Sequence, residues 1–61
     1  MKRIQVETFW DSSFDRLQKD VNKYLRELHD DCMEVVDIKI TPLSYDDYNV
    51  LHATIIYSEE V

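Results

Sequence analysis

Four consecutive residues near the middle of the chain carry side chains that could bind a metal or attack a substrate: His29, Asp30, Asp31 and Cys32. His29 could face Cys32 across one helical turn. Four adjacent ligands cannot easily converge on one tetrahedral ion, however, and the distant His52 would have to complete the set. A nucleophile pair of Cys32 and His29 lacks an evident orienting group and a glycine-lined oxyanion site. We therefore predict a polar helix terminus, with no metal site and no catalytic residue.

The absence of glycine from the sequence narrows the chemistry further. Glycine-rich phosphate loops and dinucleotide fingerprints need a backbone that a ligand can approach without meeting a side chain. With 13 Asp and Glu residues in a chain of 61, chance neighbours are expected, so no pair can be singled out as glycosidase-like. These observations predict a protein that is not an enzyme and binds no cofactor.

One segment has the repeat of an amphipathic helix. Its apolar residues recur at steps of three and four from Phe14 to Leu28, which places them within one stripe. Asp11, Ser12 and Ser13 precede the stripe and supply oxygens that can accept the free amide hydrogens of a helix start. The helix is therefore predicted to begin near Ser13.

The side of this helix opposite the stripe carries a row of basic residues: Arg16, Lys19, Lys23 and Arg26. Regularly spaced cations can follow a phosphate backbone. Acidic residues flank the row, which favours a solvated helix face with local ion pairs over direct nucleic-acid binding. Tyr24 falls inside the apolar stripe and is expected in the core rather than as a platform for stacking bases.

Three other segments alternate or are rich in β-branched residues, as strands are. Strands are predicted at residues 3–9, 33–40 and 48–57, and the connection 41–47, which contains the single proline, is typical of a β-hairpin. The chain, residues 1–61, is thus predicted to be one α+β domain of order β-α-β-β, with a three-stranded sheet and one amphipathic helix on one face. The passage from the first to the second strand should be right-handed if those strands are parallel. The order of the strands in the sheet stays open.

The last strand is apolar on both sides, whereas one helix can cover only one face of a sheet. We therefore expect the opposite face to expose Val50 and Ile56, together with Val35 and either Phe9 or Trp10. A domain of this size buries only about 60% of the surface of its unfolded chain, and a second subunit is a common remedy. The prediction is a homo-oligomer, most simply a symmetric dimer, formed through this face or through strand edges.

Aromatic residues near strand ends and loops are the expected anchors of this contact surface, because amphipathic rings often anchor binding. The predicted oligomer or partner interface comprises Val35, Val50, Ile56, Trp10, Tyr45 and Tyr48. The alternative function belongs to another class, an oligomeric sponge for a small ligand such as a nucleotide or flavin. Its pocket would lie between subunits and be lined by Tyr45, Tyr48, His52 and Trp10.

The net charge of −6 is divided unevenly along the chain. Residues 1–29 hold six basic and five acidic groups, a charge of +1, whereas residues 30–61 hold one basic and eight acidic groups, a charge of −7. The acidic half repels phosphate and is steered towards an electropositive partner, such as a nucleic-acid-binding protein. The predicted partner-binding acidic surface comprises Asp46, Asp47, Glu59 and Glu60, with no direct nucleic-acid contact.

The cysteine count and the hydropathy of the sequence indicate the cellular compartment in which the protein works. Cys32 is the single cysteine, which excludes an intramolecular disulfide and fits a reducing compartment. No stretch approaches the roughly 18 apolar residues of a membrane helix, and the start of the chain lacks an apolar signal core. A cytoplasmic protein without membrane contact is expected.

The strings "IQVETF", "VNKYLREL", "VVDIKI" and "HATIIY" follow one another in the order of the predicted elements. Over almost its whole length the chain thereby resembles a family of short, acidic, sporulation-associated proteins from Gram-positive bacteria and their phages. The "FWDSS" segment departs from the more charged helix start of that family. The resemblance implies a bacterial or phage cytoplasm and offers no catalytic residues. It favours a non-enzymatic inhibitor or regulator that binds a host protein, for instance an inhibitor of a host defence enzyme.

The predicted topology also resembles that of dodecins, small flavin-storing oligomers in which an aromatic residue on the second strand stacks on the flavin. Residues 33–40 contain no aromatic residue, and Trp10 lies at the other end of the helix connection. The resemblance therefore implies the β-α-β-β topology and an oligomeric state, but it does not imply a bound flavin.

Overall fold

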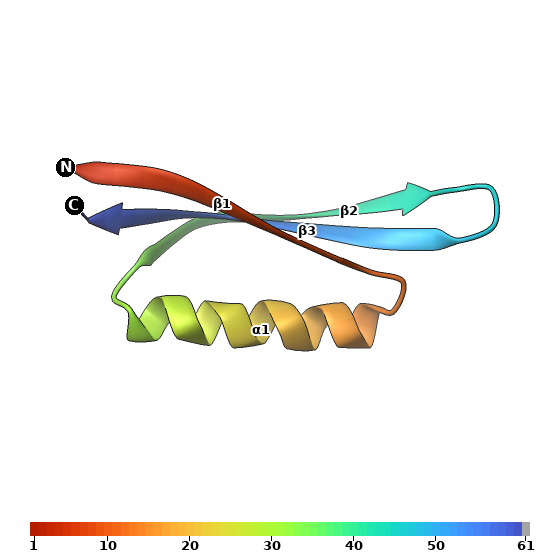
Figure 1. The fold of residues 1–61 in the computed structure, drawn as a ribbon, viewed down its shortest axis with the longest axis horizontal. Helices are drawn as coiled ribbons and strands as arrows, with labels where there is room; N and C mark the ends of the chain where they lie inside the picture. Colours follow the sequence, from red (N-terminus) through yellow and green to blue (C-terminus); the bar gives the residue numbers. More distant parts are fainter. Residues whose placement is uncertain (61) are drawn as a thin grey trace.

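The computed structural model describes residues 1–60 as four elements: β1 (Lys2–Asp11), α1 (Phe14–Asp30), β2 (Glu34–Ser44) and β3 (Asn49–Glu60). The three strands form one sheet, and the helix packs along one of its faces (Figure 1). This arrangement confirms the predicted α+β fold and its β-α-β-β order. Each strand is longer than predicted, because pairing continues beyond the stretches of clear alternation.

The sheet order is β1-β3-β2, so the last strand of the chain lies in the middle. Both edge strands run antiparallel to β3 and are therefore parallel to each other. With β1 nearer the viewer than β2, the passage from β1 through α1 to β2 turns clockwise as it recedes, which makes it right-handed (Figure 1). The central position of β3 explains why it is the most buried of the three strands, although the helix covers only one of its faces.

The helix begins and ends where local hydrogen bonds compensate its free backbone groups. At the start, the Ser13 hydroxyl accepts from the backbone N–H of Arg16 at 3.5 Å, and the N–H of Ser13 donates to Asp11 Oδ1 at 2.8 Å. The predicted start near Ser13 is thus confirmed. The N–H of Ser13 and, after it, the Arg16 guanidinium hold the pKa of Asp11 below its ordinary value.

The segment that ends the helix is a Schellman-type cap. The N–H of Cys32 donates to the carbonyl of His29 at 3.0 Å, and the N–H of Met33 donates to the carbonyl of Leu28 at 2.9 Å. Cys32 has a φ of 60°, in the left-handed region that a glycine normally occupies at this position. Since the chain contains no glycine, a cysteine takes the strained position.

The hairpin between β2 and β3 is tighter than predicted. Pro42 pairs opposite Leu51 inside β2, and the turn spans only Tyr45 to Tyr48, where the N–H of Tyr45 donates to the Tyr48 carbonyl at 2.8 Å. The prediction of a connection over residues 41–47 was therefore wrong. Proline is tolerated because β2 is an edge strand, where an outward backbone nitrogen needs no partner strand.

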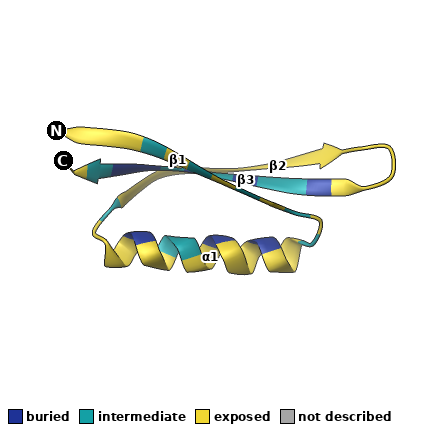
Figure 2. Ribbon diagram, viewed as in Figure 1, coloured by how far each residue is buried: buried dark blue, intermediate teal, exposed yellow. Residues whose placement is uncertain are grey.

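The core lies between α1 and the sheet face formed by the odd-numbered residues of β3. Its largest fully buried side chains are Leu17 and Ile55. The buried cluster comprises Leu17, Val21, Leu28, Ala53, Ile55 and Tyr57, with Phe9, Tyr24, Leu25, Met33 and Leu51 partly buried around it. Figure 2 shows the consequence: β3 is buried or half-buried along its length except at its two ends, whereas β2 is exposed throughout. Within residues 1–60, no helix has the length and apolar character that crossing a membrane requires.

Candidate functional site

We call the sheet face that turns away from α1 the open face. Directly paired residues of an antiparallel sheet share a face, and neighbours along a strand alternate between faces. Because Ala53, Ile55 and Tyr57 point into the core, the residues between them point away from the helix. In rows across the strands, the open face consists of Lys2 and Glu60; Ile4, Ser58 and Glu34; Val6, Ile56 and Asp37; Thr8, Thr54 and Lys39; Trp10, His52 and Thr41; and Val50 with Leu43.

Large apolar side chains on the open face are uncovered, although they belong to paired strands. The exposed fractions are 60% for Ile4, 58% for Val6 and 67% for Trp10. No described element lies over them, since α1 occupies the other side of the sheet (Figure 1). Apolar area of this kind in a soluble domain usually marks a contact surface.

A polar row of Thr8, Thr54 and Lys39 divides the open face into two parts. Towards the chain termini lies an aliphatic patch, which consists of Ile4, Val6 and Ile56. Towards the hairpin lies an aromatic hollow of about 350 Å³, which is lined by Trp10, Tyr45, Tyr48, Val50 and His52.

The aromatic hollow is built by two stacked ring pairs. Trp10 lies opposite His52 in the pairing of β1 with β3, and their ring centroids are 6.2 Å apart. Tyr45 and Tyr48 flank the hairpin turn and stack with centroids 4.9 Å apart. Val50 is the aliphatic residue of the lining, and because it is only 9% exposed, the prediction that it is exposed on this face was wrong. The four polar and aromatic residues predicted to line a pocket between subunits thus meet within one chain.

The register corrects the expected membership of this face. Val35 pairs with Tyr57 and so lies on the helix side of the sheet. The cause is a β-bulge between Val35 and Asp37, which inserts one residue and inverts the alternation. Phe9 also faces the helix, where its ring meets that of Tyr24 edge-on at 5.4 Å. Of the two aromatic residues left open by the sequence, Trp10 is the one on the open face.

The four predicted acidic residues do not form one surface. Asp46 and Asp47 form the tip of the hairpin, whereas Glu59 and Glu60 end β3 at the other end of a molecule 44 Å long. Glu59 is paired with the Arg3 guanidinium, and Glu60 lies 3.3 Å from the N-terminal amine. The two acidic groups at the hairpin are therefore the ones adjacent in sequence to Tyr45 and Tyr48 of the aromatic hollow, and within residues 1–60 neither of them forms an ion pair.

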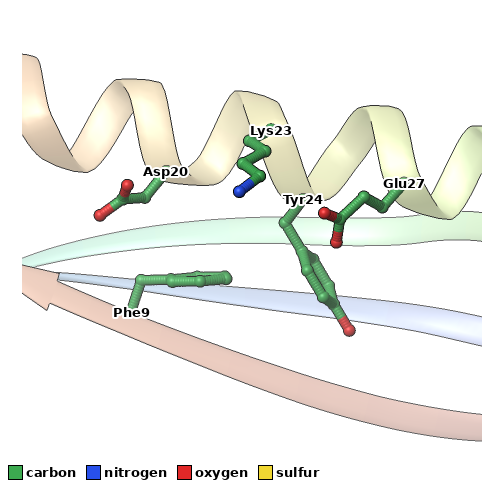
Figure 3. Close-up of a pocket in the computed structure, with 5 residues that line it drawn as sticks. All are labelled: Phe9, Asp20, Lys23, Tyr24 and Glu27. Carbon is green, nitrogen blue, oxygen red and sulfur yellow. The ribbon is translucent and has the colours of Figure 1, made fainter.

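A second hollow, of about 240 Å³, lies between α1 and β1 and is drawn in Figure 3. It is lined by Phe9, Asp20, Lys23, Tyr24 and Glu27. The Tyr24 hydroxyl donates to the Tyr57 hydroxyl at 3.1 Å, and that hydroxyl donates to Gln5 Oε1 at 3.4 Å. Burial, and then the hydrogen bond with Tyr57, raise the pKa of Tyr24 above its ordinary value. The phenol is thus a neutral structural group that joins helix to sheet, as its predicted place in the core requires.

A third, mostly apolar groove runs between α1 and β2. It holds about 220 Å³ and is lined in part by Phe14, Ile38 and Ile40, which are 53%, 39% and 51% exposed. The sequence placed Phe14 in the buried stripe, but it begins the helix at the margin of the sheet. No charged side chain lines this groove. It is therefore a poorer candidate for recognising an electropositive partner than the open face.

The residues at 29–32 have a structural role in the helix cap described above. His29 contributes its carbonyl and Cys32 its backbone N–H, while the Cys32 side chain is exposed. Among residues 1–60, no three His, Cys, Asp or Glu side chains are grouped so that they could hold a metal ion.

No protein-family model matches this chain, and no curated protein or solved structure is significantly similar to it. The resemblance to sporulation-associated proteins therefore stays a prediction. The function has to be argued from the geometry of the open face.

Proposed function

We propose that this chain is a small, non-enzymatic interaction protein whose open face binds the basic surface of another protein. The single observation that carries the proposal is the uncovered state of that face: Val6 and Trp10 are more than half exposed although they sit in a regular strand. Burying apolar surface against a partner contributes about 25 cal/mol of favourable free energy for each Å² removed from water. A protein partner would bury it.

The charge of the chain supports a basic partner. The net charge is −6, and within the strands that form the open face Glu34 and Asp37 add carboxylates to those of the hairpin. Exposed charges guide a complementary partner to the surface and suppress encounters with anionic ones. A nucleic-acid-binding protein presents the required surface, and by occupying it this chain would act as an inhibitor or regulator in a bacterial or phage-infected cytoplasm.

A small-ligand sponge remains the second candidate, because the aromatic hollow brings together the four residues expected for it. Nucleotides and flavin nucleotides carry phosphate, however. The helix start, which could bind an anion, lies on the other side of the sheet, and Asp46 and Asp47 form the turn between two tyrosines of the hollow. The electrostatics of this site therefore favour a cationic occupant.

The test begins with a defined complex rather than with capture alone. A protein recovered from the native host with the immobilised chain is purified, and its affinity is measured by calorimetry with the wild-type chain and with Val6→Asp. The matched control is Asn22→Asp, which adds the same charge at an exposed position of α1, at the groove between α1 and β2 and away from the open face. We expect Val6→Asp to weaken binding at least tenfold and the control to leave it within twofold. If both variants bind equally well, the open face is not the binding surface and the proposal is wrong.

A further inference from the structure

We propose that the aromatic hollow is a subsite for a single arginine side chain of the basic partner, held between rings and beside the hairpin carboxylates. This inference rests on the proposed function and adds the chemistry by which the open face reads its partner. The rings that would contact the guanidinium are those of Trp10, Tyr45, Tyr48 and His52. The negative charge would come from Asp46 and Asp47 in the hairpin turn.

The rings of the hollow suit a planar cation. Trp10 stacks with His52 and Tyr48 stacks with Tyr45, yet Trp10 and Tyr48 remain 67% and 56% exposed. Faces of tryptophan and tyrosine carry negative electrostatic potential and attract a cation within about 6 Å of the ring centre. A guanidinium is flat, weakly hydrated and stacks on such faces, which distinguishes it from the compact ammonium of lysine.

The dimensions of the site agree with one side chain. About 350 Å³ is at the lower end of the range for small-molecule sites and exceeds what an arginine side chain needs, so the site is partly open to water. Its walls come from different parts of the chain, because Trp10 ends β1 while Tyr45 and Tyr48 bracket the hairpin turn. A side chain entering from a partner above the open face would reach both.

The charges around the hollow also select a cation. Asp46 and Asp47 lie between the two tyrosines in sequence, and both are exposed at the turn. One opposing charge is near: Lys39 lies in the adjacent row of the open face, opposite Thr54. The two kinds of substitution should therefore have opposite effects: neutralising Lys39 should strengthen arginine binding, whereas neutralising the two aspartates should weaken it.

The test uses a capped Gly-Ser-Arg-Ser-Gly peptide as the probe and the same peptide with citrulline as its uncharged, nearly isosteric control. Trp10 is the single tryptophan, so its fluorescence and its indole N–H resonance report on the hollow directly. We expect the arginine peptide to perturb both signals saturably and to bind at least fivefold more tightly than the citrulline peptide.

Variants then separate the contributions. Tyr48→Leu should weaken arginine binding about two- to fivefold, the loss of one exposed cation–π contact. Asp46→Asn with Asp47→Asn should weaken it about threefold, and Lys39→Gln should strengthen it about twofold. Val6→Thr, on the same face but outside the hollow, should change nothing.

Three results would overturn the inference: equal binding of both peptides, indifference to Tyr48→Leu, or perturbation of Trp10 by adenosine monophosphate but not by the arginine peptide. Each leaves the proposed function testable by itself. If the arginine subsite fails while Val6→Asp still abolishes partner binding, the open face is an interaction surface without this subsite. If Val6→Asp has no effect either, both ideas fail.

Discussion

Adjacent isoleucines on the central strand give a direct test of the two-layer architecture. Ile55 is fully buried beneath the helix, whereas Ile56 lies on the open face and is only partly buried. Replacing each by alanine removes the same three carbon atoms and changes the intrinsic strand preference equally. Any difference between the two variants therefore reports on what covers each face.

The expected difference is large. Removing three buried carbons costs about 2.4 kcal/mol in transfer free energy, and the cavity raises the cost of Ile55→Ala to about 3–4 kcal/mol. Ile56→Ala should cost about 1 kcal/mol, since its side chain keeps contact with water and leaves no closed cavity. At about 0.05–0.15 kcal/mol per residue, a domain of 61 residues has a total stability of about 3–9 kcal/mol. Ile55→Ala should thus remove much of the stability of the domain.

Urea unfolding followed by circular dichroism measures both free energies. Should Ile55→Ala fail to fold, the pair Ile55→Val and Ile56→Val gives the same comparison, with about 1 kcal/mol expected for the first and close to zero for the second. Equal losses at a concentration where the chain is monomeric would refute the architecture argued above. A loss for Ile56→Ala that grows with protein concentration would instead show that a second copy covers the open face.

Three further predictions follow from individual contacts. Cys32→Gly should stabilise the domain by about 0.5–1 kcal/mol in urea unfolding, because glycine takes a positive φ without strain; a loss would contradict the assigned cap. Tyr24 has a raised pKa in the folded state, so its stabilising effect is complete below the unfolded value of about 10 and is lost as pH rises further. Tyr24→Phe should therefore flatten the alkaline fall in stability and cost about 1 kcal/mol at neutral pH, whereas the exposed control Tyr48→Phe should do neither. In the absence of the basic partner, light scattering at micromolar concentration should find a dimer that Val6→Asp dissociates and Asn22→Asp does not, and the partner should compete with this dimer for the open face; a monomer unaffected by either change would exclude assembly through the open face.

Local signals in the sequence were sufficient to predict the helix, its start and the presence of three strands. Ser13 precedes the apolar residues that recur at steps of three and four, and its side chain caps the helix in the structure. The aromatic residues near strand ends were also recognisable as a group, because Trp10, Tyr45 and Tyr48 are amphipathic rings next to turns. What the sequence could not provide was their distance from one another, since that depends on which strands pair.

Strand order and register could not be predicted from the sequence, and the structure shows why. The two-sided apolarity of β3 indicated that one of its faces is left uncovered by the helix, but it did not reveal that β3 is the central strand of the sheet. In β2 the bulge next to Val35 breaks the period of two, so counting from Ile38 and Ile40 assigned Val35 to the wrong face. Pro42 looked like a turn residue because proline cannot donate to a ladder, but an edge strand accepts it. In each case the local pattern had more than one structural interpretation, and the pairing of the strands decides between them.

The edge formed by β2 argues that the open face, rather than this edge, is available for recognition. Three features interrupt the edge: the bulge at Val35 and Asp37, the missing N–H of Pro42, and the N–H of Ile38, which already donates to Asp37 Oδ1 at 2.8 Å. Such devices keep an exposed strand from pairing with another chain. The sequence thus suppresses strand addition along β2, yet it keeps Val6 and Trp10 uncovered on the neighbouring face. A chain that needed only solubility would gain from polar residues at those two positions, so their exposure is best explained by a partner that buries them.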